Sequence, residues 1–128
     1  MTEEEIIEHG REMFEKCYNG VIPLPGPVAP DSFGELNLKL FHEVWGDDRL
    51  SFRDKRLIVI GVMGGRAGSP DMFAIHARSA LKNGELTIDE LRASMKVLLN
   101  YAGAPATSPL YLALENIIKE IEGEGAKG

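Results

Sequence analysis

Apolar residues recur every three or four positions through most of the chain, which is the spacing of amphipathic α-helices. Start signals divide this pattern, because Ser or Thr followed three residues later by an acidic residue can cap a helix N-terminus. Such pairs stand at residues 2–5, 32–35, 51–54 and 87–90, and serine followed by proline occurs at 69–70 and 108–109. The predicted helices, about six in all, begin near residues 2, 32, 51, 69, 87 and 108.

Two segments depart from this regular helical pattern. Residues 19–30 hold four prolines and are predicted to form an extended loop. The run at 57–63 is apolar almost all round, so it should be the central buried helix. The same run would also suit a strand, but the charged residues at 53–56 and the capping signal before them favour a helix. With no other strand signal and no linker, we predict an all-α single domain over residues 1–128, ending in a frayed tail at 124–128.

Composition excludes several function classes. The net charge of −6 argues against nucleic acid and against an anionic membrane as main partners, while a local basic pocket could still bind a small acidic metabolite. The single cysteine, Cys17, excludes an internal disulfide and a CxxC redox pair, which fits a reducing cytoplasm. The acidic start Thr2–Glu5 is unlike a signal peptide, and no uncharged stretch reads as a membrane span.

His76 is the most informative candidate for chemistry. Helical spacing puts it on an apolar face between Met72 and Ala80, where an imidazole must be desolvated and hydrogen-bonded. Two interpretations fit this placement: a core histidine whose hydrogen bonds are made within the protein, or a residue of a functional site. A metal site is not expected, because no second His or Cys stands at ligand spacing.

Other candidates flank the helices. Glu43, near a helix end, could orient an imidazole or raise its pKa, or could be a solvated last-turn glutamate. Tyr101 precedes small residues that would let a ligand or another chain approach closely, although a plain helix C-terminus explains those residues too. Basic residues gather around the third predicted helix, and most are expected to be solvated: Arg49, Arg53, Lys55, Arg56 and Arg66.

Five segments, in order along the chain, resemble motifs of the carboxymuconolactone decarboxylase family. They are Phe41-His42-Glu43-Val44-Trp45, the stretch from Leu50 to Leu57, the stretch from Ile75 to Gly84, the cap from Thr87 to Leu91, and Tyr101-Ala102-Gly103-Ala104-Pro105-Ala106. No single segment is specific to the family, but the ordered set, covering about residues 33–120, is.

The resemblance implies the helical fold shared with alkylhydroperoxidase D and a homotrimer or homohexamer. The thiol-peroxidase branch of that superfamily needs a CxxC pair one turn before its histidine, where this chain has Met72, so peroxidase activity is not expected. What remains is cofactor-independent and metal-free decarboxylation of a small lactone such as 4-carboxymuconolactone, part of aromatic compound catabolism. The resemblance places His76, Glu43 and Trp45 at the family's histidine, glutamate and tryptophan. We hypothesise that His76 is a catalytic proton donor or oxyanion donor and that Glu43 orients it. Either Arg53 or Arg78 would hold the substrate carboxylate, and Trp45 and Tyr101 would form the pocket walls.

Two alternatives stay open. Lys55 stands where the family carries an arginine, which would remove a bidentate contact to a carboxylate. The chain could therefore be a non-catalytic oligomer that binds an acidic metabolite or serves as an accessory protein. It could also be a decarboxylase or isomerase of a different acid.

Overall fold

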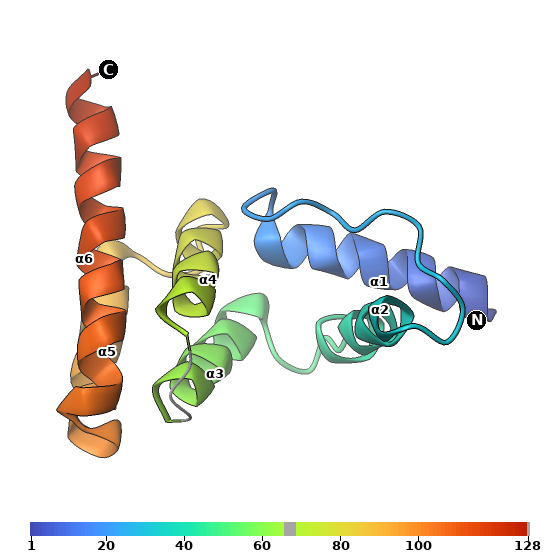
Figure 1. Cartoon of the computed structure of the whole chain (residues 1–128), viewed down its shortest axis with the longest axis horizontal. Helices are drawn as coiled ribbons and strands as arrows, with labels where there is room; N and C mark the ends of the chain where they lie inside the picture. The colour runs from blue at the N-terminus through green and yellow to red at the C-terminus, as the bar shows by residue number, and fades with distance from the viewer. Residues whose placement is uncertain (66–68, 128) are drawn as a thin grey trace. The chain divides into compact units, whose positions relative to one another are not determined.

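A computed structural model describes residues 1–65 and 69–127, and within them the chain forms six helices and no strand (Figure 1). The helices are α1 (Glu3–Tyr18), α2 (Phe33–Val44), α3 (Phe52–Gly65), α4 (Pro70–Lys82), α5 (Ile88–Ala102) and α6 (Ala104–Lys127). The all-α prediction is confirmed, and the ambiguous run at 57–63 is helical. Contacts gather into two compact units, Met1–Lys55 and Arg56–Gly128, each described here by itself. One domain over the whole chain stays a prediction.

The first unit pairs α1 with α2, which lie side by side (Figure 1). Their close approach depends on Gly10, because a Cβ added there would lie 2.0 Å from the carbonyl oxygen of Leu38. Residues 19–30 form the predicted extended loop, and Arg11 fixes it by donating to the carbonyl oxygens of Pro25 and Gly26.

The caps predicted at Thr2, Ser32, Ser51, Ser69 and Thr87 are present. In the first unit the Thr2 and Ser32 hydroxyls each accept a backbone N–H three residues on, at 3.1 Å. In the second unit Thr87 and Glu90 form a complete capping box, with each side chain bonded to the other residue's backbone N–H. These bonds satisfy N–H groups that the first helical turn leaves without partners.

The second unit packs α6 against α4 and α5 (Figure 1). Its core is built from apolar side chains of α3, α4, α5 and α6, together with Leu86 from the turn before α5. The core members are Ile60, Phe73, Ala77, Ala80, Leu86, Leu91, Met95, Leu98, Leu110, Leu114, Ile117 and Ile118.

α6 differs from expectation at both ends. α6 begins at Ala104 and not at Ser108, since Gly103 turns the chain with a φ of 89° and its carbonyl already accepts from Thr107. Pro109 therefore lies inside α6, where it removes one backbone bond after the first turn. The helix also continues through the tail predicted to fray, as far as Lys127.

The third predicted helix is buried on one face only. Ile60 is 1% exposed, whereas Ile58 and Val62 are 56% and 49% exposed. Central burial was therefore the wrong prediction for α3, because an all-round apolar sequence does not decide how many faces find neighbours. No helix within the described parts of the chain is long and apolar enough to cross a membrane.

Candidate functional site: a histidine–arginine–glutamate cluster

His76 lies in the middle of α4 and is buried, with 4% of its surface exposed. Its Nδ1 atom is 2.9 Å from Nη1 of Arg56. A guanidinium can only donate hydrogen bonds, so Nδ1 must be the acceptor. The neutral imidazole therefore carries its proton on Nε2, and this tautomer is fixed by the protein.

Arg56 is itself held by Glu85. Its Nε and Nη2 atoms lie 2.9 Å from the two carboxylate oxygens of Glu85, which is the bidentate geometry typical of strong arginine–carboxylate pairs. Asn83 donates a further bond of 3.1 Å to Glu85 Oε1. The side chains of Arg56 and Glu85 are 0% and 7% exposed, so the ion pair is almost fully desolvated.

Local backbone geometry brings Glu85 to this position. α4 ends at Lys82 with Asn83 as its C-cap, and Gly84 follows with a φ of 68°, a conformation that glycine adopts without strain. The Glu85 N–H then bonds back to the Ala80 carbonyl at 2.9 Å, which closes the turn. The turn at Asn83 and Gly84 therefore ends the helix and also places the carboxylate that holds Arg56.

The cluster keeps His76 neutral. Burial lowers the pKa of His76 to about 4, the positive charge of Arg56 adds to this lowering, and Glu85 opposes it. At neutral pH the side chain is thus an uncharged hydrogen-bond donor through Nε2. We call Arg56, His76 and Glu85 the buried cluster from here on.

Sequence reasoning found His76 but missed its partners. Most of the basic residues near the third predicted helix were expected to be solvated, and Arg56 was not singled out among them, yet Arg56 and Lys55 are buried. The signal for Arg56 was its helical phase, since it stands one turn before the fully buried Ile60. Arg66 lies outside the described residues.

Three predicted site residues, Glu43, Trp45 and Arg53, lie in the first unit. Glu43 is exposed near the end of α2, and its role in orienting His76, which belongs to the second unit, stays a prediction. Trp45 is 7% exposed and packs its ring against Phe41 and Phe52.

Trp45 also borders a cavity of about 320 Å³ together with Lys55. The Lys55 ammonium donates to the carbonyl oxygen of Trp45 at 3.0 Å and to that of Asp47. Lys55 therefore stabilises the chain after α2, because it satisfies buried backbone acceptors there.

The remaining substrate-binding candidates are more exposed. Arg53 lies on the exposed side of the first turn of α3. Arg78 on α4 forms an ion pair with Glu120 of α6. Tyr101, in the last turn of α5, is 84% exposed. The structure thus brings neither Arg78 nor Tyr101 into hydrogen-bonding contact with His76.

No group of three or more His, Cys, Asp or Glu residues within 1–65 and 69–127 could hold a metal ion. Comparison with protein-family models, curated proteins and solved structures found no match for this chain. What the site can do is therefore argued from its geometry.

Proposed function

We propose that the protein is a cofactor-independent decarboxylase of a small carboxylated lactone such as 4-carboxymuconolactone. The supporting observation is the buried cluster, in which Arg56 and Glu85 hold His76 neutral and in one tautomer. The ordered sequence motifs around His76 add the substrate class, since they resemble the family that carries out this reaction.

The reaction needs a hydrogen-bond donor that stabilises developing negative charge. When the lactone loses carbon dioxide, the electron pair left on carbon delocalises onto the conjugated carbonyl as an enolate. A preorganised N–H group directed at that oxygen stabilises the developing charge. Neutral His76 suits this role through Nε2, because its low pKa makes the imidazolium scarce at neutral pH. We therefore assign His76 the oxyanion-donor role, with solvent supplying the proton that ends on carbon.

The proposal extends to the rest of the site and to assembly. Glu43 would help to orient the site, Arg53 or Arg78 would pair with the substrate carboxylate, and Trp45 and Tyr101 would form its walls. The exposed apolar side chains of α3 support self-association into a homotrimer or homohexamer, since exposed apolar patches commonly mark interfaces. We place the assembly in the cytoplasm.

Two substitutions of His76 test the donor role against a purely structural one. The amide oxygen of Asn can replace Nδ1 as acceptor for Arg56, but Asn offers no N–H where Nε2 stands. Gln is longer and can place an amide N–H near the Nε2 position. His76→Asn should therefore lose about 100- to 1,000-fold in turnover of 4-carboxymuconolactone, and His76→Gln should lose less.

Turnover is followed by carbon dioxide release, with far-UV circular dichroism as the control for folding. Parent-like turnover in His76→Asn would reject the role of His76. Absence of turnover by the parent protein would reject the decarboxylase proposal itself.

A second candidate, a non-catalytic metabolite-binding or accessory protein, is favoured by one specific observation. Within the second unit Arg56 donates to Nδ1 of the buried His76, and Glu85 balances the charge of Arg56, as in an ordinary core cluster. Thermal-shift titration with small carboxylic acids separates the two candidates. Saturable stabilisation without carbon dioxide release supports the binding protein.

A further inference from the structure

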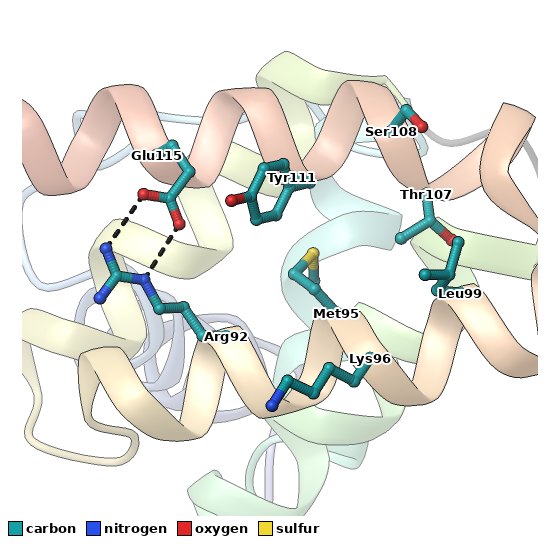
Figure 2. A pocket seen from close by; sticks show the side chains of 8 residues that line it. All are labelled: Arg92, Met95, Lys96, Leu99, Thr107, Ser108, Tyr111 and Glu115. Carbon is teal, nitrogen blue, oxygen red and sulfur yellow. Dashed lines mark hydrogen bonds and ion pairs between the residues drawn. The ribbon is translucent and has the colours of Figure 1, made fainter.

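A cavity of about 450 Å³ opens between α5 and α6, apart from the buried cluster (Figure 2). Its volume falls within the roughly 300–1,000 Å³ of small-molecule sites. Met95 and Leu99 of α5 and Tyr111 of α6 provide apolar walls. Met95 is 3% exposed, whereas Leu99 and Tyr111 are 53% and 48% exposed, so a ligand seated here would cover two large apolar side chains.

The inner end of this α5–α6 pocket holds an unsatisfied hydroxyl. Thr107 lines the pocket and is 3% exposed, yet its Oγ1 has no hydrogen-bond partner among the described residues. A buried polar group without a partner costs roughly 1–3 kcal/mol. A ligand group that hydrogen-bonds to Thr107 would remove that cost.

The other end is charged. Arg92 pairs with Glu115 through two bonds of 3.0 Å, and Arg92 lowers the pKa of Glu115, so the pair is ionised and neutral in sum. Figure 2 shows the Lys96 side chain running along α5 in the direction of Arg92 and away from Thr107. No carboxylate of the described residues pairs with Lys96, which leaves one net positive charge among the lining residues.

We propose that the α5–α6 pocket binds an amphipathic organic monoanion, with its acidic group at Lys96, its apolar body along Met95 and Leu99, and a hydroxyl or carbonyl at Thr107. The distance along α5 from Arg92 to Leu99 is about 10 Å at the helical rise, which suits a chain of about eight carbons. The site is independent of the decarboxylase proposal, because no residue of the buried cluster lines it.

Calorimetric titration with octanoate and 8-hydroxyoctanoate tests the proposal, with octylammonium as the probe of opposite charge. We expect saturable binding of octanoate, weaker binding of octylammonium, and tighter binding of 8-hydroxyoctanoate. Lys96→Met should weaken octanoate about tenfold, the effect of losing one charged contact. Lys119→Met is the matched control, since Lys119 is an exposed lysine of α6 that does not line the pocket.

The Thr107 hydroxyl is tested by the difference between the two acids. Thr107→Val, which keeps the shape of the side chain, should abolish the advantage of 8-hydroxyoctanoate, and Thr107→Ser should retain it. Equal binding of octylammonium and octanoate, or an unchanged affinity in Lys96→Met, would overturn the proposal. So would the finding, by analytical ultracentrifugation, that a second copy of the chain occupies the groove and that Leu99→Asp releases it.

Discussion

Because of His76, the free energy of unfolding of the second unit should fall as the pH is lowered from about 7 to about 4. Its pKa is 6.5 in an unfolded chain and about 4 in the fold, where burial and Arg56 both disfavour the charged form. Above pH 6.5 both states are neutral, and the stability is fully present. As the pH falls below 6.5 the unfolded chain binds a proton that the folded chain refuses, so the free energy of unfolding falls.

The size of the effect follows from the same two values. A separation of about 2.5 pKa units corresponds to about 3 kcal/mol once the pH is below both values, and to about 2 kcal/mol near pH 5. For a domain of this size such a loss is a large fraction of the total stability. His76→Asn should remove it, because the amide keeps an acceptor for Arg56 but does not titrate.

Two measurements check this prediction. The chain has three histidines, so NMR can follow each imidazole, and the signal missing from His76→Asn identifies His76. That signal should stay constant down to about pH 5. Urea unfolding, followed by far-UV circular dichroism, should lose about 2 kcal/mol more in the parent than in His76→Asn between pH about 7.5 and pH about 5. Fluorescence of Trp45, the only tryptophan, reports the first unit separately. A His76 midpoint near pH 6.5, or equal pH dependence in the two proteins, would refute the reasoning.

Three further substitutions test the packing that surrounds these sites. Arg56→Leu should lower the free energy of unfolding by about 3–5 kcal/mol, because the Glu85 carboxylate would stay buried without its partner. Replacing both residues with Leu should recover most of this loss in urea unfolding, and a double variant as unstable as Arg56→Leu would contradict the reasoning. Gly10→Ala should cost about 1–3 kcal/mol, because its Cβ would collide with the Leu38 carbonyl, and a parent-like midpoint of Trp45 fluorescence would argue against that close approach. Thr107→Val should leave the melting temperature unchanged or raise it, since it removes an unsatisfied buried hydroxyl, and a clear loss of stability would show that the hydroxyl has a partner.

The helices and most of their ends could be read from the sequence. Thr2, Ser32 and Thr87 each cap a helix by bonding to a residue three positions on. Such a bond closes within one turn of chain, so the residues that decide it stand next to one another in the sequence. The prediction that α6 begins at Ser108 was wrong, because its earlier start depends on the turn at Gly103, which no side-chain signal marks.

The sequence by itself also placed His76 on an apolar face, and the structure confirms its burial. Only tertiary structure decided which atoms meet it. Arg56 and Glu85 stand 29 positions apart, and their pairing depends on which face of α3 packs inward and on how the chain turns after α4. Burial makes that pairing obligatory, because a charge removed from water must find its partner within the protein. The neutral state and tautomer of His76 follow from this packing and not from the local sequence.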